Sequence, residues 1–179
     1  KAMDKNISVF CEKPLFWENG TSYKEIKKKI LQIQKHKKIN FLVNTSNSYF
    51  IDEILKIKKI KKIKFLKFIF HTNGLNKFSD IGVDLLPHGL SILIRALGFD
   101  KISNLTKSIS EFFVKYKFIY KNADVQFEFM QGSDIKKKMM IQLNNLTFLR
   151  QQNSYGVNYK VDLIEGNGEK IRSLKDPFS

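Results

Sequence analysis

The pattern of apolar residues in the second half of the chain constrains the fold most strongly. From Ile109 onward, apolar and polar residues alternate in short runs, and each run is followed by residues that favour turns. These breaks include Lys121-Asn122, Gly132-Ser133-Asp134, Asn144-Asn145 and Gly166-Asn167-Gly168. Alternation with a period of two places one face of a strand on a core, and short turns join antiparallel neighbours. The pattern therefore predicts an antiparallel meander of about five or six strands.

The first 45 residues follow a different pattern. Ile7–Cys11 and Phe41–Val43 are short apolar runs, and we expect both to be buried strands. Between them, Ser22 and Glu25 have the spacing of a capping box, followed by isoleucines at helical spacing up to about Lys38. The order strand, helix, strand predicts one βαβ unit, which cannot bury both of its faces alone.

The middle of the chain predicts two further helices and a strand. Tyr49–Lys58 and Asp80–Leu97 are the helical segments, and Ile63–His71 is the strand between them. Pro87 lies inside the second helix, where it predicts a kink or a restart. Gly98 follows that helix at a position suited to a left-handed end.

The charge of the chain comes almost entirely from lysine. Formal net charge is +15, from 32 Lys+Arg against 17 Asp+Glu, and only Arg95, Arg150 and Arg172 are arginines. Proteins that read nucleic acid favour arginine for bidentate contacts, so we expect a lysine-coated surface rather than nucleic-acid binding. No apolar run is long enough for a membrane span, so no membrane partner is expected. The single cysteine, Cys11, excludes an intramolecular disulfide and predicts the cytoplasm.

Two short motifs contain residues suited to chemistry. Glu12-Lys13-Pro14 follows a predicted buried strand, and side chains at the carboxyl end of a parallel strand point into the crevice where α/β sheets bind ligands. Asp84 and His88 are four residues apart on a predicted helix, so both can reach the same hydroxyl or ketone. The alternatives are a strand that ends in a solvated charged pair and a histidine satisfied within the core. No metal-ligand spacing is present.

Together, these motifs resemble those of the glucose-fructose oxidoreductase and inositol dehydrogenase (Gfo/Idh/MocA) family. In that family a strand ending in Glu-Lys-Pro closes the dinucleotide-binding domain, and an Asp-x-x-x-His pair follows some seventy to eighty residues later. The resemblance implies an α+β chain: the end of a Rossmann-type α/β domain over 1–45, then a substrate-binding domain over 46–179. The second domain would be an open-faced, mainly antiparallel sheet with helices on one side.

The resemblance also implies a function. Lys13, Asp84 and His88 would be catalytic, with His88 as general acid/base, and Glu12, Lys13 and Pro14 would contact NAD or NADP. The substrate would be a sugar, sugar nucleotide or polyol, and the outer face of the sheet would form a homo-oligomer.

One departure from the family pattern limits what this chain does alone. It contains no Gly-x-Gly-x-x-Gly sequence, so we expect a C-terminal part of an oxidoreductase that is inactive by itself. The alternatives are a non-catalytic binding or dimerisation module of the same fold and, less favoured, a basic nucleic-acid-binding protein.

Overall fold

The structure is a computed structural model that describes residues 7–13, 21–36, 40–44, 47–152 and 160–174. The chain divides into two compact units, Lys1–Thr45 and Ser46–Ser179, and each is described by itself. No helix among the described residues is both long enough and apolar enough to cross a membrane.

The first unit is a βαβ arrangement. Strands β1 (Val9–Cys11) and β2 (Phe41–Val43) pair in parallel, and helix α1 (Tyr23–Gln34) connects them in sequence. The capping box is present: the Glu25 backbone N–H donates to Ser22 Oγ at 3.3 Å, and the Ser22 N–H donates to Glu25 Oε2 at 2.8 Å. No residue of α1 is buried.

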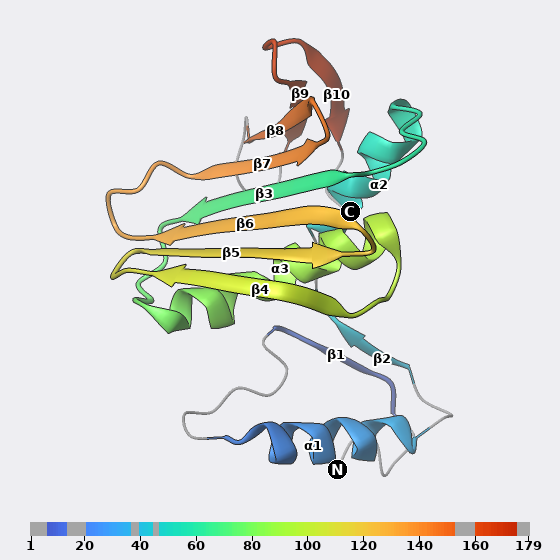
Figure 1. Ribbon diagram of the computed structural model, residues 1–179, viewed down its shortest axis with the longest axis vertical. Helices are drawn as coiled ribbons and strands as arrows, with labels where there is room; N and C mark the ends of the chain where they lie inside the picture. The colour runs from blue at the N-terminus through green and yellow to red at the C-terminus, as the bar shows by residue number, and fades with distance from the viewer. Residues whose placement is uncertain (1–6, 14–20, 37–39, 45–46, 153–159, 175–179) are drawn as a thin grey trace. The chain divides into compact units, whose positions relative to one another are not determined.

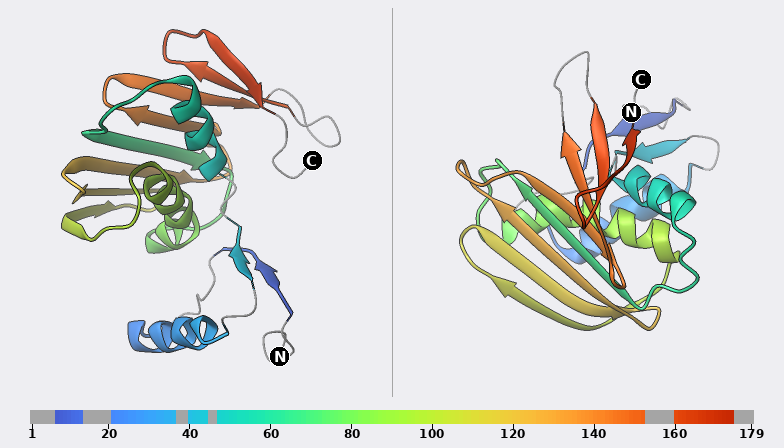
Figure 2. Two further views of the ribbon diagram at one scale, coloured as in Figure 1. Left: turned by 90° about the vertical axis from the view of Figure 1, so that its right-hand side faces the viewer. Right: turned by 90° about the horizontal axis from the view of Figure 1, so that it is seen from above.

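The second unit contains an eight-stranded sheet and two helices, and both helices lie on one face of the sheet (Figures 1 and 2). The elements, in chain order, are α2 (Ser48–Ile57), β3 (Phe65–Thr72), α3 (Ser79–Leu97), β4 (Ile102–Ile109), β5 (Phe113–Tyr120), β6 (Ala123–Gln131), β7 (Lys138–Leu143), β8 (Leu146–Gln152), β9 (Val161–Glu165) and β10 (Lys170–Leu174). The strand order is β10-β9-β8-β7-β3-β6-β5-β4. The prediction of an α+β fold with a mainly antiparallel sheet is confirmed.

The topology differs from the predicted meander in two respects. Strand β3 lies between β6 and β7, parallel to β6 and antiparallel to β7, so the strands after α3 form two antiparallel groups on either side of it. Strand β4, over Ile102–Ile109, also lies before the segment in which the alternation predicts strands. All eight residues of β4 are exposed at the sheet edge, so they carry no core pattern to indicate a strand.

Helix α3 runs without interruption from Ser79 to Leu97, and Pro87 does not divide it into two helices. Proline removes one backbone donor, but the rest of the helix is stabilised by packing on the sheet. At the C-terminal end, Gly98 has φ 74° and its N–H donates to Ile94 O at 2.7 Å. Gly98 has the positive φ that a left-handed end requires, but its ψ of −179° lies outside the left-handed helical region, so the prediction is confirmed only for the sign of φ.

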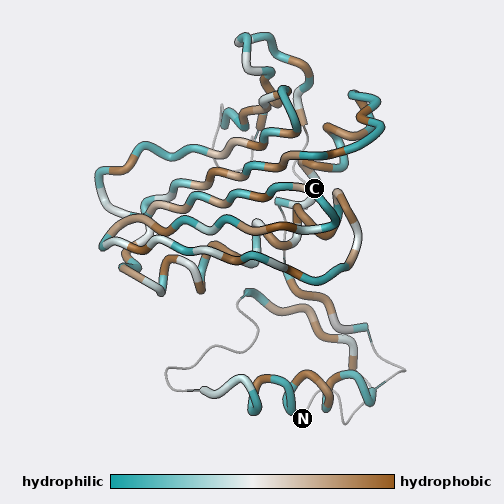
Figure 3. Tube along the Cα trace, viewed as in Figure 1, coloured by the Kyte–Doolittle hydropathy of each residue, from teal (hydrophilic) through white to brown (hydrophobic). Residues whose placement is uncertain are grey.

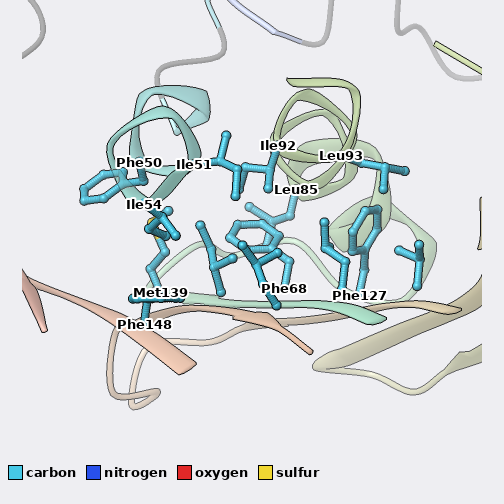
Figure 4. Packing of buried hydrophobic residues seen from close by; sticks show 14 of the residues in the cluster. Phe50, Ile51, Ile54, Phe68, Leu85, Ile92, Leu93, Phe127, Met139 and Phe148 are labelled. Carbon is cyan, nitrogen blue, oxygen red and sulfur yellow. The ribbon is translucent and has the colours of Figure 1, made fainter. Parts of the chain in front are cut away.

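The core lies between the two helices and the face of the sheet that they cover (Figure 4). Buried residues alternate with more exposed ones along much of β5 and β6. Hydrophobic and hydrophilic residues alternate along the trace of the same strands (Figure 3). The fully buried members of the core include Phe50 and Ile54 from α2, Ile92 from α3, and Phe68 and Phe127 from the sheet. Burial of each such side chain contributes about 1.5–3 kcal/mol, which fixes α3 firmly against the sheet.

Candidate functional site

The first group of candidate residues lies at the carboxyl ends of β1 and β2. Glu12 and Lys13 directly follow β1, and Asn44 directly follows β2. Because the two strands are parallel, these residues share one edge, and Asn44 Nδ2 donates to Glu12 Oε1 at 2.6 Å. The Lys13 side chain is half-buried. Pro14, the last residue of the motif, lies outside the described residues.

The second group lies on α3. Asp84 and His88 are both half-buried, and because the helix is continuous their four-residue spacing puts them one turn apart on one face. That face meets the sheet. Asp84 Oδ2 accepts a hydrogen bond from Gln131 Nε2 at 2.6 Å, and the His88 ring packs edge-on against Phe70 with centroids 5.3 Å apart.

The spacing of these contacts follows from the geometry of a helix lying antiparallel to a strand. Asp84 is joined through Gln131 to Thr72, since Gln131 Nε2 also donates to Thr72 Oγ1 at 3.1 Å. His88, one turn later on α3, meets Phe70, two residues earlier on β3. Four residues along a helix and two residues along a strand both span about 6–7 Å, so each turn of α3 lies next to every second residue of β3.

Two glycines let α3 approach the sheet closely. A Cβ atom on Gly89 would lie 3.0 Å from the Phe127 ring, and one on Gly82 would collide with the Tyr116 hydroxyl. Burial raises the pKa of that Tyr116 phenol above its ordinary value. The close approach places the Asp84 carboxylate within hydrogen-bond distance of a side chain at the end of β6.

Among the predicted site residues, Asp84 and His88 therefore share one helix face in the second unit. Glu12 and Lys13 share one strand end in the first unit. The sequence pattern did not indicate Asn44, Thr72 or Gln131 as site residues. A signal for Gln131 was present: it ends the series Val125, Phe127, Phe129, so it is a polar residue in the buried phase of an alternating strand.

Other groups in the described residues do not extend these sites. No cluster of three or more His, Cys, Asp or Glu side chains there is arranged to hold a metal ion. A surface hollow of about 310 Å³ lies along α1, lined by residues such as Thr21, Lys28 and Gln32. Its carboxylate, Glu25, is already engaged in capping that helix.

Comparison with known proteins gives fold-level relatives only. No protein-family model matches the sequence, and no curated protein matches it either. Several solved structures share the fold. UDP-N-acetylglucosamine 3-dehydrogenase GnnA from Acidithiobacillus ferrooxidans has a TM-score of 0.64 and 12% identity, with 98% of this chain and 58% of that chain covered.

Two further structures are similar. An oxidoreductase from Agrobacterium radiobacter in complex with NAD+, L-tartaric acid and magnesium has a TM-score of 0.59 and 15% identity, with coverage of 99% and 56%. The dehydrogenase MviM from Clostridium difficile has a TM-score of 0.58 and 17% identity, with coverage of 97% and 56%. The chain thus has the fold of part of these oxidoreductases and spans less than two thirds of their length.

Proposed function

We propose that this chain belongs to an NAD- or NADP-dependent oxidoreductase of the Gfo/Idh/MocA family. In this proposal, Ser46–Ser179 is the substrate-binding domain and Lys1–Thr45 is the last part of the dinucleotide-binding domain. The substrate is a sugar, a sugar nucleotide or a polyol, and the protein acts in the cytoplasm. The fold shared with NAD+-complexed and sugar-nucleotide oxidoreductases supports this proposal.

The observation that carries the proposal is the presentation of Asp84 and His88 on one face of α3. In alcohol oxidation, the His88 imidazole takes the proton from the substrate hydroxyl, and in ketone reduction it returns that proton. The Asp84 carboxylate accepts a hydrogen bond from the substrate beside it, which orients the reacting carbon. The Lys13 ammonium stabilises negative charge that develops on the reacting oxygen.

The residues at the ends of β1 and β2 fit one end of the proposed cofactor. Glu12 and Lys13 follow a parallel strand, at the edge where α/β sheets bind ligands, and the Asn44 amide fixes the Glu12 side chain. The family resemblance assigns this edge to the nicotinamide end of the dinucleotide. When bound, the nicotinamide supplies the hydride acceptor or donor. Nothing in the chain matches the glycine-rich turn that holds the pyrophosphate.

The proposal is tested with the complete product of the gene that encodes this chain. A panel of sugars, sugar nucleotides and polyols is incubated with NAD+ and NADP+, and nicotinamide reduction is followed by absorbance. We expect one substrate class to reduce one of the two cofactors. Lys13→Met should lower the rate about 100-fold, as expected for loss of a charge at the reacting oxygen, whereas Lys28→Met on exposed α1 should not. A panel without any reduction would count against the proposed activity.

A second candidate function, a dimerisation module, is favoured by the face of the sheet opposite the helices. Ile69, Met140, Leu149 and Ile164 are directly paired from strand to strand, so they form one apolar row across β3, β7, β8 and β9. We propose that a second copy of the chain covers this row. Sedimentation should show a dimer that Leu149→Lys dissociates and that Ser103→Lys, on the exposed edge strand, leaves intact. A wild-type monomer at high concentration would exclude this dimer.

A further inference from the structure

Gln131 is one of two buried polar residues in the described structure, with a relative exposure of 1%. It is the last residue of β6 and lies opposite Thr72, the last residue of β3, in a parallel pair. Its side chain points to the helix-covered face, the same side as Phe127 and Phe129 four and two residues earlier. A glutamine at this position takes the place of an apolar core residue.

Both amide hydrogens of Gln131 are used. Nε2 donates to Asp84 Oδ2 at 2.6 Å and to Thr72 Oγ1 at 3.1 Å. The backbone of Gly74 lies directly against the carboxamide, since a Cβ atom there would be 2.5 Å from Nε2. The side chain is therefore held in one orientation, with its donors directed at the carboxylate and the hydroxyl.

The acceptor of the same carboxamide is not satisfied. Oε1 is buried without a hydrogen-bond partner in the part of the chain that the structure describes. An unsatisfied buried acceptor costs about 1–3 kcal/mol, and such groups in native proteins call for an explanation such as a functional role. A methionine of similar size would avoid this cost, but it would also lose the hydrogen bonds to Asp84 and Thr72, so the glutamine is explained by the two groups that its amide holds.

We propose that Gln131 is a positioning residue that holds the Asp84 carboxylate in one rotamer, one helical turn from His88. This role rests on the proposed function, because it assigns Gln131 to the same reaction. Thr72 is the second anchor: it takes the other amide hydrogen and so prevents the carboxamide from rotating away from Asp84. The chain from Thr72 through Gln131 to Asp84 ties the candidate helix to the ends of two parallel strands.

The first test uses the 179-residue chain and the NMR signals of glutamine side-chain amides. The Gln131 amide signals should move with pH as the Asp84 carboxylate takes up a proton, and Asp84→Asn should abolish this movement. Gln126 is the matched control, because its Nε2 donates to Glu128 Oε1 at 2.6 Å on the other face of the sheet. Its signals should be unaffected by Asp84→Asn. Gln131 signals that do not change with pH and are the same in the Asp84→Asn variant would overturn the proposal.

The second test uses the complete gene product and the substrate found with the panel of sugars, sugar nucleotides and polyols. Gln131→Met should lower kcat about 10- to 100-fold with little change in KM, because a misplaced catalytic group loses transition-state stabilisation. Gln126→Met should leave both constants unchanged. Unfolding curves of each variant show whether the fold is retained, and Thr72→Val, which removes only the second anchor, should show a smaller loss of kcat in the same direction.

The two tests separate the two proposals. Suppose that the Gln131 amide signals depend on Asp84 but the protein has no oxidoreductase activity. The hydrogen bond between Gln131 and Asp84 would then be supported, and the proposed function would be rejected. Normal kcat in a folded Gln131→Met variant of an active enzyme would reject the positioning role and leave the function standing.

Discussion

At the scale of single residues, Glu128 shows how the positive charge of this lysine-rich surface is neutralised locally. Its carboxylate lies between two lysines on the neighbouring strands. Lys115 Nζ is 2.8 Å from Oε1, and Lys67 Nζ is 3.0 Å from Oε2. Burial acts to raise the pKa of this carboxyl group, but the hydrogen bonds from Lys115 and Lys67 outweigh it and hold the pKa below its ordinary value. The unfolded chain therefore takes up this proton at a higher pH than the folded chain does.

This shift predicts a pH-dependent loss of stability in Glu128→Gln. The contribution of Glu128 is fully present above the unfolded pKa of about 4.3 and is lost as pH falls through the lower folded pKa. Denaturant unfolding should show the variant about 1 kcal/mol less stable than the wild type at neutral pH, with the difference narrowing in acid.

The exposed pair of Glu111 with Lys77 provides the control for this prediction. The two side chains are 2.6 Å apart but 46% and 54% exposed, so Glu111→Gln should change stability little at any pH. A Glu128→Gln difference that stays constant into acid would contradict the assignment of the effect to the carboxylate charge.

At the scale of elements, the packing of α3 on the sheet depends on glycines that face large side chains. Gly82→Ala should destabilise the chain by about 1–3 kcal/mol, because the added Cβ would collide with the Tyr116 hydroxyl. The direction of this effect is informative, since alanine in an unhindered helix would stabilise by about 1 kcal/mol. Thermal or denaturant unfolding measures the difference.

A double variant tests the mechanism of this destabilisation. In a Tyr116→Phe background the hydroxyl is absent, and the next ring atom, Cζ, lies 3.3 Å from the point that the added Cβ atom would occupy. Gly82→Ala should then lower the free energy of unfolding by much less. Gly89→Ala, which meets the Phe127 ring instead, should be destabilising in both backgrounds. If Gly82→Ala lowers the free energy of unfolding equally with and without the tyrosine hydroxyl, contact with this hydroxyl does not cause the destabilisation.

The elements also show how far the sequence predicts this fold. Local signals predicted the capping box at Ser22, the helix that contains Asp84 and His88, and the positive-φ Gly98, because each depends on neighbouring residues. The position of β3 between β6 and β7 depends on contacts remote in sequence, so no local pattern revealed it. Strand β4 escaped prediction because it is exposed along its whole length. Gln131 was not predicted as a site residue because a single polar residue after an apolar alternation is also typical of the end of a strand.

At the scale of the whole molecule, the candidate residues are divided between the two units. Lys13 and Glu12 follow a strand of the first unit, whereas Asp84 and His88 lie on a helix of the second. The three solved oxidoreductases compared with it are longer than this chain, which covers 56% to 58% of their length. The proposed activity is therefore one to measure on the complete gene product.

The central claim is that His88 exchanges the substrate proton, and turnover of His88→Asn tests it most directly. With the cofactor and substrate identified by the panel, the variant should lose at least about 100-fold in kcat while its unfolding curve stays close to that of the wild type. His36→Asn, two residues after the end of α1, should retain full activity. A folded His88→Asn variant with wild-type turnover would contradict the account and place the acid/base group elsewhere.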